Sequence, residues 1–261
     1  ELFHNFTLIH DDVVDRDTHR RGRPTVWHLF GHDHAINDGD AQLLHVSELL
    51  ASAAADIENG LATQLYLLRQ FRRVVEGQYL DFELTAATLG DPAVTVSAYE
   101  AMIDAKTADL IVAAACGAGL VAEVSDTERR TLEEYARNLG LAYQVCDDVV
   151  SIWASGAATG KRSYGDIKER KKTLPILYAH EHLAAHERSR LEHYYSGTNE
   201  MTDTTCEAVI ALLDTVDTKA VMEARIDDFA QAAKQAAKQL SITTEQRTIL
   251  CELVDSLLPK V

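Results

Sequence analysis

The chain has 261 residues, of which 46% are hydrophobic and 25% are charged, and its formal net charge is -16. This length and composition provide for one large folded domain and exclude a disordered chain. The acidic excess excludes nucleic acid as a partner, because phosphate binding requires a surplus of lysine and arginine. The four cysteines form no CxxC pair, a usage typical of the reducing cytoplasm. No apolar run reaches the roughly 18 residues that a transmembrane helix needs.

Apolar periodicity predicts helices along the whole chain, without the alternation expected of strands. The first helix is predicted over residues 1–17 and ends before Gly22 and Pro24. Because this helix begins without a capping residue, we expect further helices upstream of Glu1. The next predicted helices cover 35–56, 60–89 and, after Pro92, a segment that contains 99–120.

The second half of the chain also predicts helices. Ser125 and Glu128 form a capping box, and the helix that follows should continue to about Trp153. A polar loop is expected over 154–172. Beyond it, three or four amphipathic helices are expected, one beginning at Thr243 and one containing 225–240. The sequence therefore predicts an all-α, single-domain helical bundle over residues 1–261.

Two acidic clusters stand out, each at the end of an apolar helix and each followed by a basic loop. The first is Asp11, Asp12 and Asp15, and the second is Asp147 and Asp148. Neighbouring carboxylates repel one another unless a cation lies between them, and such oxygen ligands suit Mg²⁺. A single cluster is explained equally well by a solvated helix end. Two clusters with matching basic loops favour a site for metal ions and an anion.

Basic residues supply the complement to this anion. The positions are Arg20, Arg21, Lys161, Lys171 and Lys172 in the two loops. In addition, Lys106 and Thr107 interrupt an apolar helix. A buried lysine there costs free energy unless it meets an anion, although its stem could also reach solvent. Guanidinium and ammonium groups in this number are suited to a diphosphate.

Three other segments resemble known binding motifs but do not have the residue spacing that those motifs require. The segment GAATGKRS is one residue too short for a phosphate-binding loop and follows no predicted strand. The segment DRDTHRRG lacks the glycine and glutamate positions of an EF-hand. His28, His32 and His34 have no cysteine or carboxylate at zinc-ligand spacing, so exposed histidines are expected.

Three segments resemble, in order, motifs of the trans-type polyprenyl diphosphate synthases, and the similarity covers most of the chain. They are DDVVDRDTHRRGRPTVW, KTADLI and GLAYQVCDDVVSIWASGAATGKRSYGDIKERKKTLP. The resemblance implies an isoprenoid synthase fold with a central active-site cavity, in a homodimer. It also implies an enzyme, most like geranylgeranyl diphosphate synthases, that condenses an allylic diphosphate with isopentenyl diphosphate. Three Mg²⁺ ions, or Mn²⁺ in their place, would serve as cofactors.

The resemblance also assigns roles to residues. Asp11, Asp15 and Asp147 would ligate the metal ions, with support from Asp12, Asp148 and Asp166. The allylic diphosphate would be held by Arg20, Lys106, Lys161 and Lys171, with Thr107 and Gln144 beside the leaving group. His4 and Arg21 would contact the isopentenyl diphosphate. The set implied as catalytic is Asp11, Asp12, Asp15, Lys106, Thr107, Gln144, Asp147 and Lys161.

Phe6 is implied to limit product length. It precedes Asp11 by five residues, about 7.5 Å along a helix, and the family places this position in the pocket for the growing tail. Thr7 is small and adds no second barrier, so a C20 product is expected. The alternative is that Phe6 is an ordinary core residue.

Two departures from the family pattern and two alternative functions accompany this interpretation. Ser151 replaces a frequent aspartate, and the family's upstream Gly-Lys-Arg segment is absent. A class I terpene cyclase would use the same scaffold, but it would not require His4 and Arg21. A non-catalytic subunit of a heteromeric synthase is expected to lose acidic residues from the first cluster, and here all three are present.

Overall fold

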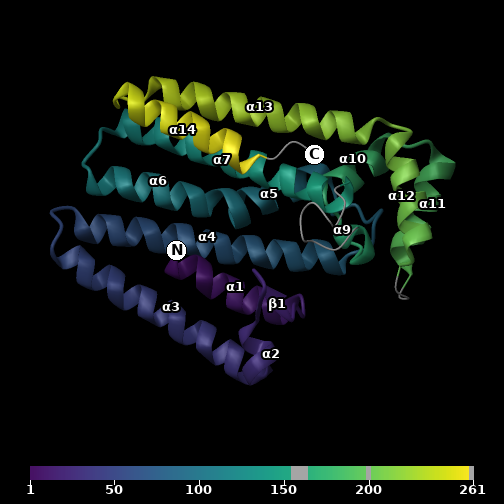
Figure 1. Cartoon of the computed structure of the whole chain (residues 1–261), viewed down its shortest axis with the longest axis horizontal. Helices are drawn as coiled ribbons and strands as arrows, with labels where there is room; N and C mark the ends of the chain where they lie inside the picture. Colours follow the sequence, from purple (N-terminus) through teal and green to yellow (C-terminus); the bar gives the residue numbers. More distant parts are fainter. Residues whose placement is uncertain (154–163, 198–200, 259–261) are drawn as a thin grey trace. The chain divides into compact units, whose positions relative to one another are not determined.

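The computed structural model describes residues 1–153, 164–197 and 201–258, and it divides into two compact units, 1–71 and 72–261. Helices make up nearly all of both units (Figure 1), which confirms the all-α prediction. Among the described residues, no helix is long and apolar enough to cross a membrane. The assignment of the whole chain to one domain stays a prediction.

The first unit contains three helices and a small hairpin before the start of α4. In order these are α1 (Leu2–Val14), β1 (His19–Arg20), β2 (Arg23–Pro24), α2 (Val26–Phe30), α3 (His32–Ala55) and the beginning of α4 (Gly60–Ala86). Helix α1 packs closely against α3 at Gly39. A Cβ added to this glycine would lie only 2.2 Å from Nε2 of His10. Phe3 stacks on Phe71 with ring centroids 3.9 Å apart, so α1 buries its aromatic side.

The hairpin lies where the sequence predicted only a loop. Arg20 pairs with Arg23 across the two strands, and the turn residues Arg21 and Gly22 have φ values of 51° and 74°. Two successive positive φ values are typical of a tight two-residue hairpin turn, in which glycine fits without strain. Each strand is only two residues long, so no alternation of apolar residues could reveal it.

The second unit holds the remaining helices. After α4 come α5 (Val96–Ile103), the π-helical turn η1 (Asp104–Ala108), α6 (Asp109–Val121), α7 (Asp126–Trp153), α9 (Gly165–Lys168), α10 (Leu174–His182), α11 (Ala185–Ser196), α12 (Asp203–Asp214), α13 (Thr218–Gln239) and α14 (Thr244–Leu257). Five helices follow α9 in the described residues, where three or four were expected. The single helix expected around residues 99–120 is interrupted by η1, and α9 falls inside the expected loop.

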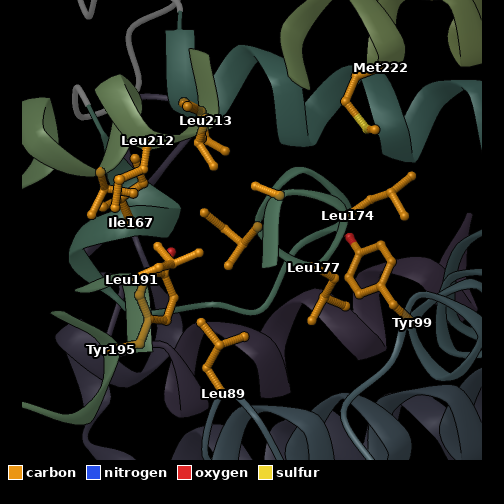
Figure 2. Packing of buried hydrophobic residues seen from close by; sticks show 14 of the residues in the cluster. Leu89, Tyr99, Ile167, Leu174, Leu177, Leu191, Tyr195, Leu212, Leu213 and Met222 are labelled. Carbon is orange, nitrogen blue, oxygen red and sulfur yellow. The ribbon is translucent and has the colours of Figure 1, made fainter. Parts of the chain in front are cut away.

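The core of the second unit is built around α7, along which α13 packs (Figure 1). Figure 2 shows Tyr99, Leu174, Leu177 and Met222 turned toward one cluster of buried side chains. These residues come from α5, α10 and α13, so the cluster fixes the end of α7 that carries the second acidic cluster. Burying such side chains contributes about 1.5–3 kcal/mol each.

Two helix starts follow sequence signals. The Ser125 hydroxyl accepts a hydrogen bond from the Glu128 amide at 3.2 Å, which confirms the serine half of the predicted capping box, while Oε1 of Glu128 accepts from the Ser241 amide. At the start of α14, the Thr243 hydroxyl accepts from the Gln246 amide at 3.2 Å, and the Gln246 side chain accepts from the Thr243 amide at 3.0 Å.

We predict that Thr243→Ala lowers the free energy of unfolding by about 1 kcal/mol, because the Gln246 amide loses its hydrogen-bond acceptor at the start of α14. Urea unfolding followed by circular dichroism measures this. The control is Thr248→Ala on the same helix, whose hydroxyl bonds only to the Thr244 carbonyl at 3.0 Å. Equal unfolding midpoints for the two variants would contradict the assigned role of the cap.

Candidate active site

The first acidic cluster lies at the end of α1, in the first unit. Asp12 is buried, and its Oδ1 accepts a hydrogen bond from Nε of Arg20 at 2.6 Å. Burial raises the pKa of the Asp12 carboxyl, and the Arg20 guanidinium opposes this rise. Asp11 is half-buried, and Asp15, the C-cap of α1, is exposed. The cluster therefore contains one buried carboxylate fixed to an arginine and two more accessible ones.

The other candidate residues of this unit lie on α1 and on the hairpin turn. His4 is half-buried, which lowers the pKa of its imidazole. Phe6 is buried, with its ring centroid 5.4 Å from that of Phe3 and 5.0 Å from that of His10. Arg21 is exposed at the tip of the hairpin.

The second unit contains a cavity of about 200 Å³ among α4, α5, η1, α7 and the segment around α9. Most of its lining is charged or polar, and Leu84 and Met102 add an apolar part. The lining residues are Asp81, Leu84, Thr85, Tyr99, Met102, Lys106, Gln144, Asp147, Asp148, Asp166, Lys171, Lys172 and Thr173. The structure thus brings together seven candidate residues marked in the sequence: Lys106, Gln144, Asp147, Asp148, Asp166, Lys171 and Lys172.

A chain of hydrogen bonds orders one wall of this cavity. The Thr107 hydroxyl donates to Oε1 of Gln144 at 2.8 Å, and Nε2 of Gln144 donates to Oδ1 of Asp148 at 3.1 Å. The Tyr99 hydroxyl donates to Oδ2 of Asp148 at 2.6 Å. These bonds fix the Gln144 amide and use both oxygens of Asp148, so Asp148 supports the site rather than lying open in it.

The carboxylates of the cavity repel one another. Burial raises the pKa of Asp148 to about 8, and the charge of Asp166 adds to the rise. Burial likewise raises the pKa of Asp166, with a further contribution from Asp147 and opposition from Lys171. A divalent cation would relieve this repulsion, so the oxygen donors of the cavity fit Mg²⁺.

The cavity residues would supply only part of the coordination shell of a Mg²⁺ ion, and other molecules would complete it. Among the described residues, no three histidine, cysteine, aspartate or glutamate side chains stand close enough together to hold an ion by themselves. This agrees with the usual mode of Mg²⁺ binding, in which one or two carboxylates are completed by phosphate oxygens and water.

Asp81 and Thr173 also line the cavity, although they were not among the residues predicted from the sequence. Lys106 is half-buried, and its Nζ lies 2.6 Å from Oδ2 of Asp81, which gives this lysine an anionic partner. Nζ of Lys172 donates to the Thr85 carbonyl at 2.7 Å, at the C-terminal end of α4. The signal for Asp81 was its spacing of four residues from Thr85, which places both on one face of α4.

Lys161 lies outside the described residues.

Comparison with known proteins identifies the family. Residues 1–213 match the family model described as polyprenyl synthetase, so the chain belongs to the polyprenyl synthetase family. It is 38% identical over 182 residues to the (2E,6E)-farnesyl diphosphate synthase of Mycobacterium bovis, a match that covers 70% of this chain and 49% of that protein. The geranylgeranyl diphosphate synthase of Mycobacterium tuberculosis is 36% identical over 240 residues, covering 89% of this chain and 65% of that protein.

Solved structures give the same result for the fold. Geranylgeranyl pyrophosphate synthetase from Pyrococcus horikoshii superposes with a TM-score of 0.89 at 27% identity, covering 100% of this chain and 77% of that one. A polyprenyl synthase from Caulobacter crescentus, solved with calcium and isoprenyl diphosphate, superposes with a TM-score of 0.83 at 27% identity. This match covers 99% of this chain and 76% of that one. The chain therefore has the fold of these synthases, although it spans only about half to two thirds of the length of the curated relatives it matches.

We predict that millimolar Mg²⁺ with inorganic diphosphate raises the melting temperature of the chain, because an ion relieves the repulsion among the cavity carboxylates. At a ligand concentration of about 100 times Kd, the gain is about 2.7 kcal/mol. Differential scanning fluorimetry with and without chelator measures the shift. Asp147→Asn should reduce it, whereas Asp214→Asn, at the far end of α12, should not. An equal shift in both variants would show that the ion binds elsewhere.

Proposed function

We propose that the chain is a prenyltransferase that condenses an allylic diphosphate with isopentenyl diphosphate. The observation that carries this proposal is the cavity of the second unit, where Lys106 and Lys171 meet the carboxylates of Asp147, Asp148 and Asp166. Such a combination suits a diphosphate bound through divalent ions. The family membership and the isoprenyl diphosphate found in the Caulobacter structure support the same reading.

In the proposed reaction, Lys106 and Lys171 bind the oxygens of the allylic diphosphate. Lys106 now pairs with Asp81, and Lys171 lies 3.0 Å from Glu169, so a diphosphate would compete with these carboxylates. Thr107 and Gln144 stand beside the leaving group, with Gln144 held in one orientation. Lys161 and Arg20 are proposed to contribute further cationic contacts, and His4 and Arg21 to bind isopentenyl diphosphate.

Divalent ions would be ligated by Asp11 and Asp15 in the first unit and by Asp147 in the second, with Asp12 supporting the first cluster. When bound, three Mg²⁺ ions, or Mn²⁺ in their place, would stabilise negative charge on the departing diphosphate. The allylic carbon–oxygen bond breaks, and the isopentenyl double bond attacks the allylic carbon. A proton then leaves the new carbon chain for the released diphosphate. Leu84 and Met102 keep part of the cavity apolar, which protects a carbocation from water.

The deciding experiment incubates the chain with labelled isopentenyl diphosphate and an allylic diphosphate, and separates the products by chromatography. Label in a longer linear diphosphate supports the proposal. A cyclic hydrocarbon formed without isopentenyl diphosphate would instead indicate a terpene cyclase. Absence of any product, with the allylic diphosphate intact, would indicate a non-catalytic role for this chain.

We also propose that the chain forms a homodimer. On α4, Val75, Tyr79 and Phe82 are spaced four and three residues apart, and they are 48%, 61% and 43% exposed. This spacing forms one apolar stripe, which a second copy of the chain could cover. Tyr79→Glu should shift the mass measured by light scattering toward the monomer, whereas Thr127→Glu, at an exposed position of α7, should not. A dimer unaffected by Tyr79→Glu would exclude this surface as the interface.

We predict that Asp11→Ala and Asp147→Ala each lower kcat by roughly two powers of ten or more in saturating Mg²⁺. Each loses a proposed metal ligand and leaves charge on the diphosphate unsatisfied, at about 1.4 kcal/mol per tenfold in rate. Initial rates of labelled isopentenyl diphosphate incorporation measure this. Asp214→Ala is the control, and Ser151→Ala should have only a mild effect. Wild-type turnover by either first variant would refute the metal assignment.

We propose geranylgeranyl diphosphate as the main product, with Phe6 as the residue that limits its length. Among the relatives, both farnesyl and geranylgeranyl diphosphate synthases occur. Phe6 is buried against Phe3 and His10, so a core role is the competing explanation.

We predict that Phe6→Ala extends the products beyond C20, because removal of the ring opens the pocket for the growing tail. The control is Phe3→Ala, which removes a buried ring from the same helix. Both substitutions should destabilise the fold by roughly 3–5 kcal/mol. Chromatography of the dephosphorylated products distinguishes the two roles. If both variants give the wild-type product at temperatures where they remain folded, Phe6 is only a core residue.

A further inference from the structure

The π-helical turn η1 carries both Lys106 and Thr107. It is closed by a backbone hydrogen bond from the Asp109 amide to the Asp104 carbonyl, five residues back instead of four. Such wide turns are less stable than α-helix and occur frequently at functional sites. Something in the surrounding structure must therefore stabilise this one.

Two arginines from neighbouring helices bind both residues that close the turn. Arg73 of α4 donates from Nε to Oδ2 of Asp109 and lies 3.4 Å from Oδ2 of Asp104. Arg137 of α7 donates to Oδ1 of Asp104, and its other terminal nitrogen lies 3.2 Å from Oδ1 of Asp109. Asp109 is fully buried, so its charge depends on these partners. We call Arg73, Asp104, Asp109 and Arg137 the four-residue ion cluster.

The spacing of the two aspartates makes this cluster specific for a π turn. In a regular α-helix, residues five apart point about 140° away from each other around the axis. A turn with bonds five residues apart brings such residues close to the same side. Both carboxylates can therefore reach the same two guanidinium groups only while the turn stays wide.

Two glycines next to the arginines complete the arrangement. A Cβ on Gly77 would lie 2.3 Å from the Lys106 amide nitrogen, and one on Gly140 would lie 2.6 Å from Cα of Ala108. Gly77 follows Arg73 by four residues and Gly140 follows Arg137 by three, so each glycine shares a helix face with its arginine. The backbones of α4 and α7 thus touch η1 directly, beside the four-residue ion cluster.

We propose that the four-residue ion cluster holds η1 in its π-helical form and thereby positions Lys106 and Thr107 toward the cavity. Among the described residues, none of the four lines the cavity, so they act through Lys106 and Thr107 as positioning residues. If the turn relaxed to α-helix, these two side chains would rotate away from Asp81 and Gln144, the partners they now contact. This inference rests on the proposed function, because it treats Lys106 and Thr107 as diphosphate-binding groups.

The test measures binding of inorganic diphosphate by calorimetry in the presence of Mg²⁺, without reliance on turnover. Asp104→Asn is the principal variant, because Asp104 is only half-buried and its loss leaves Asp109 paired with both arginines. Its Kd should rise roughly 10-fold or more, as is usual when a residue that orients a ligand-binding group is lost. Arg137→Met should have a larger effect. In both variants, hydrogen exchange of amides 104–109 should accelerate while that of α13 stays unchanged.

Two controls separate positioning from stability. Asp126→Asn removes the exposed ion pair with Arg129 at 2.8 Å, a similar chemical change elsewhere in the same unit. Met222→Ala removes a fully buried side chain on α13 and lowers stability from the core. All proteins are compared at the same interval below their own melting temperatures. Both controls should bind inorganic diphosphate with the wild-type Kd.

The outcomes are distinct. A folded Asp104→Asn variant with wild-type Kd and wild-type exchange in η1 would overturn the inference, even if Arg137→Met failed to fold. A rise in Kd of the same size in Met222→Ala would also overturn it. Absence of diphosphate binding by the wild-type chain would refute the proposed function instead.

Discussion

The buried carboxylate of Asp148 is the interaction on which the second unit depends. Its two oxygens receive hydrogen bonds from the Tyr99 hydroxyl, the Gln144 amide and the Leu174 backbone amide, at 2.6, 3.1 and 3.3 Å. These donors belong to α5, α7 and the start of α10. A carboxylate taken out of water is costly unless its oxygens are satisfied, so the three helices must keep their places around it. Gln144 extends this constraint to Thr107, and hence to η1.

Both units hold their cations in the same manner. Arg20 is bound to buried Asp12 in the first unit, and Lys106 to Asp81 in the second. Each pair brings a long basic side chain into a fixed position, which lowers the entropy lost when it later binds a ligand. The excess of acidic residues over basic ones is consistent with this arrangement.

The glycines and the ion cluster around η1 show how a local departure from α-helix is maintained. A π turn is unfavourable by itself, and here it is compensated by contacts from two other helices. Gly77 and Gly140 permit backbone contact, and Arg73 and Arg137 bind the carboxylates at both ends of the turn. The irregular segment is thus stabilised by the pairing of its own terminal carboxylates with arginines of neighbouring helices.

The sequence by itself determined the all-α class, the bounds of α1, α3, α4 and α7 to within a few residues, and the hydroxyl caps at Ser125 and Thr243. These features depend on apolar periodicity and on hydrogen bonds between residues three or four apart, which are local. It also marked residues that meet in the cavity: Lys106, Asp147 and Asp148 as charged residues in an apolar helix or at its end, Lys171 and Lys172 as basic residues of the following loop, and Gln144 and Asp166 through the family resemblance.

Only the tertiary structure decided the partners of these residues. Asp81 lies 25 residues from Lys106, Tyr99 lies 49 from Asp148, and Arg73 lies 36 from Asp109. No periodicity links such positions, because the distance between them is set by how α4, α5 and α7 pack. The same holds for η1 and for the hairpin at Arg21 and Gly22. A π turn within a helix is stabilised by contacts with residues distant in sequence. Strands of two residues are too short to leave a pattern in the sequence.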